Sequence, residues 1–121
     1  MKREIKFRGI RVDNNQWVEG YFFKHWDKCY IAWGTINDNP VLIEVVPETV
    51  GQFTGLKDKN GKEIFEGDIV QHDAWDYPFS IIFNTERARF VCKMKTSLTH
   101  HIDNLCLTVI GNIHDNPELI K

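Results

Sequence analysis

The sequence lacks the features that mark several specialised classes of protein. No apolar run approaches the roughly 20 residues that a membrane-spanning helix needs, and the longest candidate, residues 41–46, is interrupted by Glu44. Residues 1–8 carry charges without an apolar segment, so no signal peptide is expected. The three cysteines are odd in number and widely spaced, which excludes a disulfide framework. These absences favour a reduced cytoplasmic protein that does not enter a membrane.

Neither sign of charge dominates the composition. The 121 residues include 15 Lys and Arg against 17 Asp and Glu, a formal net charge of −2. A slightly negative chain is a poor general binder of nucleic acid, whose phosphates attract cations. The 4 Trp, 3 Tyr and 8 Phe residues supply enough apolar surface for a core. Intrinsic disorder is therefore excluded as the main state.

Apolar and polar residues alternate with a period of two, which is typical of β-strands. The alternating segments are residues 5–8, 79–84, 88–95 and 105–110. In the third segment the pattern predicts Arg89, Lys93 and Lys95 on one face and an apolar stripe on the other.

Three further segments are apolar at consecutive positions and so on both faces of a strand. They are residues 21–23, 30–33 and 41–46. Such strands are either central in a sandwich or present one face to another subunit.

Turn residues separate the predicted strands. Asn60-Gly61 is a strong hairpin signal because both residues tolerate a positive φ. Gly67 is expected to turn the chain sharply into a core strand at residues 69–70. Residues 96–104 are consistent with either a short helix or a loop.

We therefore predict an all-β protein in two parts. Residues 1–56 form an N-terminal β-meander of about four strands, and residues 57–121 form a small barrel-like sheet similar to SH3 barrels. The chain ends in one helical turn, in which Asn116 caps and Pro117 takes the first position.

Motifs for phosphate and calcium binding are incomplete. Gly61-Lys62 resembles the end of a phosphate-binding loop, but Glu63 follows where Ser or Thr is needed. Asp58, Asn60 and Gly61 resemble part of a calcium loop, yet Glu63 also stands where that motif needs glycine. A solvated turn is the expected role of this segment.

Zinc ligands are present but not in a recognisable spacing. The possible donors are Cys29, Cys92, Cys106, His25, His72, His100, His101 and His114. No Cys-x-x-Cys pair occurs among them, and the adjacent His100 and His101 are expected to point apart on regular structure. The sequence therefore assigns no metal ligand and no cofactor.

A catalytic set is also missing. No Gly-x-Ser-x-Gly motif surrounds a serine, and no local Cys/His signature occurs. The carboxylates of Glu63, Glu66 and Asp68 are close in sequence, but around Gly67 they are expected to cap a turn and remain in water. We predict no catalytic residue and a protein that is not an enzyme.

Nucleic-acid binding is the alternative that the cations and aromatic residues leave open. The basic residues of the first segment are Lys2, Arg3, Lys6, Arg8 and Arg11, and the tryptophans are Trp17, Trp26, Trp33 and Trp75. A small barrel with cations and stacking aromatics can bind single strands. Residues 1–56 and 57–121 are each close to neutral, however, so this interpretation is not favoured.

Three sequence blocks resemble the YopX family of phage and prophage proteins. They are residues 3–9 (REIKFRG) with 17–21 (WVEGY), residues 47–70 (PETVGQFTGLKDKNGKEIFEGDIV) and residues 109–119 (VIGNIHDNPEL). Many members have Ala-Trp-Asp after the first strand, where this chain has Gly9-Ile10-Arg11, which suggests a subgroup.

The resemblance implies a phage or prophage protein of the bacterial cytoplasm, with a mostly β fold and a tendency to form homo-oligomers. It implies no established activity and no site residue. We expect a non-enzymatic accessory protein that binds itself or an unknown host or phage protein, with Tyr21, Phe22, Phe23, Trp26 and Trp33 suited to the interface.

Overall fold

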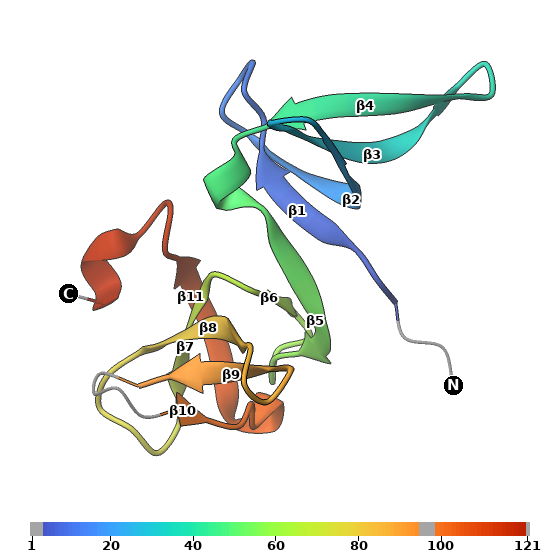
Figure 1. Cartoon of the computed structure of the whole chain (residues 1–121). Helices are drawn as coiled ribbons and strands as arrows, with labels where there is room; N and C mark the ends of the chain where they lie inside the picture. The colour runs from blue at the N-terminus through green and yellow to red at the C-terminus, as the bar shows by residue number, and fades with distance from the viewer. Residues whose placement is uncertain (1–3, 95–98, 121) are drawn as a thin grey trace. The chain divides into compact units, whose positions relative to one another are not determined.

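The protein is built from β-strands, as predicted. The structure, a computed structural model, describes residues 4–94 and 99–120, in which eleven strands and three short 3-10 helices occur (Figure 1). The chain divides into two compact units, Met1–Phe53 and Thr54–Lys121, called here the N-terminal and C-terminal units. This division falls close to the boundary after Leu56 that the turn signals suggest.

An antiparallel meander forms the N-terminal unit. Its elements are β1 (Phe7–Ile10), β2 (Trp17–His25), β3 (Lys28–Ile36), β4 (Asn39–Val45), the 3-10 helix η1 (Pro47–Thr49) and the first residues of β5 (Gly51–Lys57). The spatial order is β4-β3-β2-β1-β5, with β5 on the far side of β1 from β2 (Figure 1).

One face of this meander is buried and the other is not. Cys29, Ile31 and Val45 are buried and pack against Phe7, Val18 and Val50. Burying an aliphatic side chain contributes roughly 1.5–3 kcal/mol, so this small core holds the strands together. The segments that are apolar on both faces therefore use only one of them for folding.

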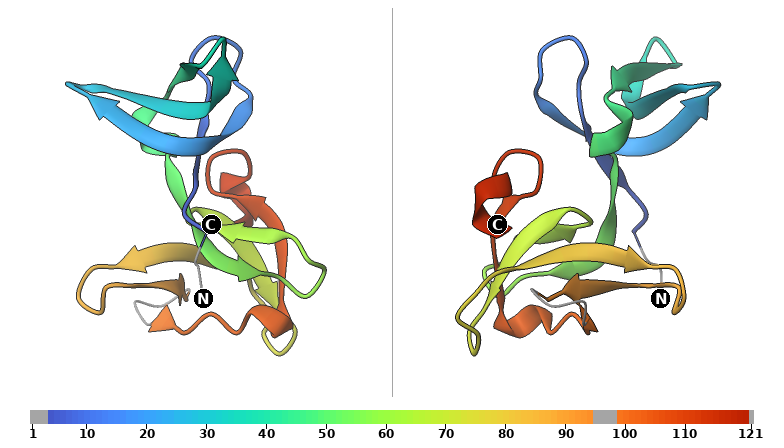
Figure 2. Two further views of the ribbon diagram at one scale, coloured as in Figure 1. Left: turned by 90° about the vertical axis from the view of Figure 1, so that its right-hand side faces the viewer. Right: turned by 60° about the vertical axis from the view of Figure 1, so that its left-hand side comes forward.

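The C-terminal unit is a five-stranded antiparallel sheet with an additional hairpin. Its elements are the end of β5, β6 (Glu63–Phe65), β7 (Asp68–His72), β8 (Phe79–Asn84), β9 (Arg89–Lys93), β10 (Thr99–His100), η2 (Asn104–Cys106), β11 (Leu107–Asn112) and η3 (Pro117–Ile120). The strand order of the sheet is β10-β9-β8-β7-β11, and β6 pairs with β5 (Figure 2). The buried cluster is Ile64, Val70, Phe79, Ile81, Cys92 and Leu107.

Both predicted glycine turns are present. Gly61 has φ +84° in the hairpin that joins β5 to β6, and Gly67 has φ +93° between β6 and β7. The Gly67 N–H donates to the Ile81 carbonyl at 2.8 Å. Asp68, expected in water, is only 2% exposed, and its carboxylate accepts the Phe65 N–H at 2.7 Å. The carboxylate thus stabilises the turn from inside the fold.

Substituting Gly67 tests the turn. Gly67→Val is expected to lower the free energy of unfolding by about 1–3 kcal/mol, because a β-branched residue is strained at positive φ. Gly34→Val is the matched control, since a Cβ at Gly34 meets nothing within 4 Å and strands accept valine. Equal denaturation midpoints for the two variants would contradict the turn assignment.

Two of the predicted strand alternations are wrong in detail. Val91 is buried although it lies on the same face as Arg89 and Lys93, so the cationic face is not wholly solvated. Ala88 has φ +52° and precedes β9, and Lys95 lies outside the described residues. In the last segment, Leu105 belongs to η2 and is 75% exposed, because β11 begins only at Leu107.

The ends of the C-terminal unit also differ from expectation. Residues 99–100 form the edge strand β10, where a helix or loop was predicted, and residues 96–98 lie outside the described part of the chain. The final turn is present as η3, with Asn116 directly before Pro117, and the Leu119 N–H donates to the Asn116 carbonyl at 3.1 Å. The Asn116 side chain accepts the Asn112 N–H at 3.3 Å, which ties the turn back to the end of β11.

Candidate functional site

Large aromatic side chains are exposed on the N-terminal unit. Tyr21 is 70% exposed and Trp26 is 84% exposed, and Phe22, Phe23 and Trp33 are also accessible. These five residues, called here the aromatic surface, are the ones that the sequence predicts for an interface. They come from β2, from the turn after it and from β3. Tyr21 and Phe23 lie on the outer face of β2, whereas Phe22 lies on the other face, opposite Ile31 and with its ring 5.4 Å from that of Phe7.

The aromatic surface is exposed because β2 is longer than its neighbour β1. β1 pairs only with residues 17–20 of β2. Residues 21–25 continue beyond β1 and pair with β3 on one side. Among the residues that the structure describes, no strand pairs with the opposite edge of residues 21–25. Within the part of the chain that the structure describes, the β2–β3 hairpin therefore has exposed side chains and one unpaired backbone edge.

Rings on the outer face of the hairpin touch one another without being covered. The Phe23 ring lies 6.2 Å from that of Tyr30, its partner across the strands, and 6.3 Å from that of His25. Centroid distances of this size are typical of interacting aromatic pairs. The result is a pre-formed apolar face, not a set of isolated side chains.

Trp26 has a backbone conformation that does not favour tryptophan. It follows His25, which pairs with Lys28, so Trp26 is the first residue of a two-residue hairpin turn. Its φ is +59°, a value at which glycine or asparagine is preferred in such turns. The strain is of order 1–3 kcal/mol. Nothing in the fold of this unit requires a large ring there, since the side chain is exposed.

The predicted basic segment is largely neutralised. Arg11 forms a bidentate ion pair with Asp13, in which Nε donates to Oδ1 at 2.9 Å and Nη2 donates to Oδ2 at 2.8 Å. These hydrogen bonds hold the pKa of the Asp13 carboxyl below its ordinary value. Lys6 lies 3.7 Å from Glu19, and Arg8 stacks over the Trp17 ring at 4.7 Å. Lys2 and Arg3 lie outside the described residues. Cations engaged in this way offer little to a phosphate backbone.

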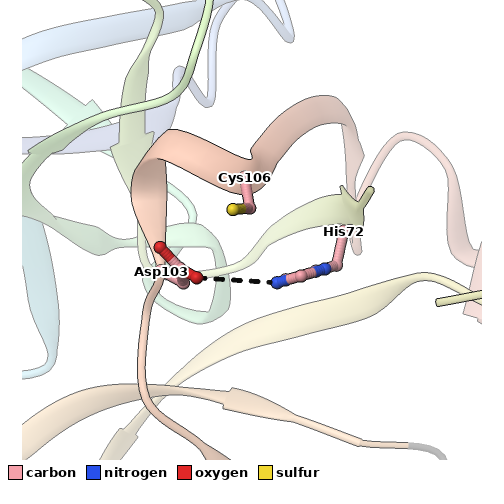
Figure 3. Close-up of side chains that lie close together, drawn as sticks. All are labelled: His72, Asp103 and Cys106. Carbon is pink, nitrogen blue, oxygen red and sulfur yellow. Dashed lines mark ion pairs between the residues drawn. The ribbon is translucent and has the colours of Figure 1, made fainter. Parts of the chain in front are cut away.

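A polar cluster in the C-terminal unit joins three residues that are distant in sequence. His72 ends β7, Asp103 precedes η2, and Cys106 ends η2 (Figure 3). One donor atom from each lies within 4.8 Å of the others. His72 Nε2 is 3.8 Å from Asp103 Oδ2, and His72 is nearly buried whereas the Asp103 side chain is 43% exposed.

Hydrogen bonds define the protonation of this cluster. The Ala74 N–H donates to His72 Nδ1 at 3.0 Å, so the proton of the neutral ring is on Nε2, facing Asp103. The Cys106 thiol is hydrogen-bonded to Asp103, and that bond, followed by burial, raises the pKa of the thiol. A protonated thiol beside a carboxylate is not an activated nucleophile.

His72 and Cys106 are two of the eight possible zinc donors in the sequence, but their spacing does not predict that they lie together. Asp103 was missed altogether, because acidic residues are common and no spacing relates it to His72. His100 and His101, expected to point apart, stack with ring centroids 4.3 Å apart, because β10 ends at His100 and His101 leaves the strand.

The other two cysteines lie in separate cores. Cys29 is buried in the N-terminal unit and Cys92 in the C-terminal unit. Burial raises the pKa of the Cys92 thiol to about 12. Both residues therefore behave as small apolar side chains.

The segment that resembles a calcium loop is a turn exposed to solvent at residues 59–62, as predicted, but Asp58 at its start is buried. Asp58 is 5% exposed, and its carboxylate accepts N–H bonds from Asn60, Lys62 and Val109, each at 2.9 Å. Burial opposes the charged form, but these bonds outweigh it and hold the pKa of Asp58 below its ordinary value. Oxygens that are committed to the backbone do not fit a calcium site.

A hollow of about 220 Å³ lies in the C-terminal unit between β8, β9 and η3. Tyr77, Met94 and Ile120 contribute apolar walls, and Lys93 is the charged group at its edge. Neither a carboxylate nor a histidine is among the described residues that line it. It therefore lacks the acid and base that proton-transfer chemistry needs.

Comparisons with known proteins give a family but not an activity. No described helix is long and apolar enough to cross a membrane. No curated protein matches the chain. Among solved structures, the crystal structure of protein EF1440 from Enterococcus faecalis is similar, with 27% identity and a TM-score of 0.63 over 99% of this chain and 100% of that one. The family model described as YopX protein matches residues 6–121, nearly the whole chain. This protein therefore belongs to the YopX family.

Proposed function

We propose that this protein is a non-enzymatic accessory protein of a phage or prophage, and that it acts in the bacterial cytoplasm by binding a second copy of itself. The aromatic surface carries this proposal. Tyr21 and Phe23 are exposed side by side on the outer face of β2, and exposed aromatic patches mark interaction sites. The strained Trp26 adds support, because a residue kept at a cost to folding commonly serves another purpose.

A second copy fits the open edge of β2. In an antiparallel pairing about a two-fold axis at Phe23, Phe22 of one copy faces Lys24 of the other, and Tyr21 faces His25. Both of these pairs join an aromatic ring to a basic side chain, Phe23 faces Phe23 at the axis, and no like charges meet over residues 21–25. An interface that matches itself in this way closes as a dimer.

Removing the exposed rings is expected to dissociate the dimer. The double variant Tyr21→Ser/Phe23→Ser should sediment as a monomer at concentrations where the unmodified chain is a dimer, because the central rings of an interface supply most of its binding free energy. Leu105→Ser is the matched control, since it removes an equally exposed apolar side chain from the C-terminal unit. A monomeric unmodified chain, or a dimeric double variant, would refute the proposal.

A substitution at Trp26 is expected to have opposite effects on the stability of the fold and on self-association. Trp26→Gly is expected to raise the free energy of unfolding of the N-terminal unit by about 1 kcal/mol, because glycine accepts the positive φ. The same variant should weaken self-association by about tenfold or more, since exposed tryptophans are frequent hot spots. Unfolding in denaturant and sedimentation equilibrium measure the two effects. A variant that is both more stable and equally associated would remove Trp26 from the interface.

The nucleic-acid alternative has less support. Lys6 and Arg11 face acidic partners, as described above. Exposed Arg89 and Lys93 remain in the C-terminal unit, but Val91 between them is buried. A gel-shift titration at low salt with single- and double-stranded DNA tests it directly, and binding that weakens with added salt would favour it.

A further inference from the structure

We propose that His72, Asp103 and Cys106 bind a zinc ion. Imidazole nitrogen, carboxylate oxygen and thiolate sulfur are the three ligand types that zinc takes in proteins. All three converge here, with their donor atoms within 4.8 Å of one another (Figure 3). Bonds of about 2.0–2.3 Å place tetrahedral ligands roughly 3.5 Å apart, so a contraction of roughly an ångström completes the site.

The backbone already holds the three ligands in one place. Leu107, which follows Cys106, pairs with His72 across β11 and β7. The Asp73 N–H donates to the Cys106 carbonyl at 3.0 Å, and the Cys106 N–H donates to the Asp103 carbonyl at 2.9 Å. Adjustments of side chains alone therefore bring the donors to the metal, which limits the entropy lost on binding.

Charge favours a divalent ion at this position. Cys106 loses its proton to solvent as the sulfur–zinc bond forms, because thiolate is the ligand form, and Asp103 binds as the carboxylate. The carboxylate and thiolate together neutralise Zn²⁺, and His72 contributes a neutral nitrogen. One proton is released for each ion bound, and the Asp103 side chain, which is 43% exposed, is accessible from solvent.

Binding also requires a change of tautomer at His72. Nε2 is the atom that faces Asp103, and it must give up its proton to become a ligand, so the proton moves to Nδ1. The Ala74 N–H then loses its acceptor and faces a second donor, so the His72 ring must turn away from it. Ala74 lies in an exposed turn and can bond to water, so the lost hydrogen bond lowers affinity by roughly tenfold without preventing binding.

Titration with cobalt tests the site on the full chain, purified without a histidine tag and freed of metal by a chelator. Co²⁺ replaces zinc and reports its ligands in the absorption spectrum. We expect one equivalent to give visible bands of tetrahedral cobalt and a near-ultraviolet sulfur-to-cobalt charge-transfer band, both displaced by Zn²⁺. Zinc should also raise the melting temperature in proportion to the logarithm of its concentration.

Two variants and a control assign the ligands. Cys106→Ser is expected to abolish the charge-transfer band, and His72→Gln to lower zinc affinity at least tenfold. Cys29→Ala removes a thiol from the N-terminal unit and should change neither. Absence of stoichiometric binding, a charge-transfer band that survives in Cys106→Ser, or unchanged affinity in His72→Gln would overturn the proposal. Circular dichroism of each variant confirms that a lost signal does not reflect unfolding.

Discussion

Asp58→Ala is expected to lower the free energy of unfolding of the C-terminal unit by about 3–5 kcal/mol. The Asn60, Lys62 and Val109 N–H groups all donate to this carboxylate, and the substitution removes their acceptor. A buried donor left without a partner costs about 1–3 kcal/mol. Water can replace part of the loss at the exposed Asn60, which limits the sum.

Urea denaturation of the full chain measures this effect, and hydrogen exchange resolved by peptide locates it. Faster exchange should appear in peptides from β6, β7 and β11, since Asp58 joins the first hairpin to the last strand of the unit. Asp73→Ala is the control. It breaks an exposed ion pair with Lys59 and should cost less than about 1 kcal/mol. Equal losses from the two variants would contradict the role of Asp58.

The same carboxylate predicts a dependence on pH. Because the pKa of Asp58 is lower in the folded than in the unfolded chain, the charged group stabilises the fold above the unfolded pKa of about 3.9. That contribution is lost as the pH falls through the folded pKa. The difference in unfolding free energy between the unmodified chain and Asp58→Asn should therefore be constant near neutral pH and shrink in acid. A difference that grows in acid would reverse the assigned sign.

Gly20→Ala is expected to destabilise the N-terminal unit by about 2–4 kcal/mol. A Cβ at this position would lie 2.3 Å from the Ala32 carbonyl oxygen and 2.9 Å from its carbon. The clash is with backbone, so β2 and β3 must separate where their pairing begins, and no rotation of a side chain relieves it. This is why a glycine interrupts an otherwise well-formed strand.

Gly34→Ala provides the comparison within the same sheet. The added methyl group at Gly34 meets nothing within 4 Å, so its effect should stay within about 0.5 kcal/mol. Thermal unfolding of both variants gives the difference in stability. Similar melting temperatures would show that β2 and β3 can shift without cost, and that this hairpin is less tightly paired than its geometry indicates.

Local chemistry made the strands and turns predictable. The period-two pattern, Asn60-Gly61 and Gly67 depend on backbone conformation over a few residues, and the structure contains the strands and both turns. The prediction that Leu105 lies in a strand is wrong, because an alternating pattern does not show at which residue the strand begins. The exposed outer face of residues 21–23 corresponds to one of the two predicted alternatives, since strands that are apolar on both faces are either central in a sandwich or present one face to another subunit.

The polar cluster and the buried carboxylates were beyond local reasoning. The sequence predicts Asp58 and Asp68 in turns exposed to water. They are buried because strands distant in sequence pack around them. His72 and Cys106 are brought together by the pairing of β7 with β11. Such contacts depend on which distant strands become neighbours, and that information is absent from any short window of sequence.

The bond from Val109 to Asp58 spans 51 positions of the chain, which has a consequence for biosynthesis. Contacts so far apart in sequence form slowly and only once both partners have left the ribosome. The C-terminal unit cannot close before β11 emerges, whereas every pairing among β1 to β4 involves residues made much earlier. If chains associate through the β2–β3 hairpin as proposed, nascent chains on one messenger have this hairpin available for pairing while the remainder is still being translated.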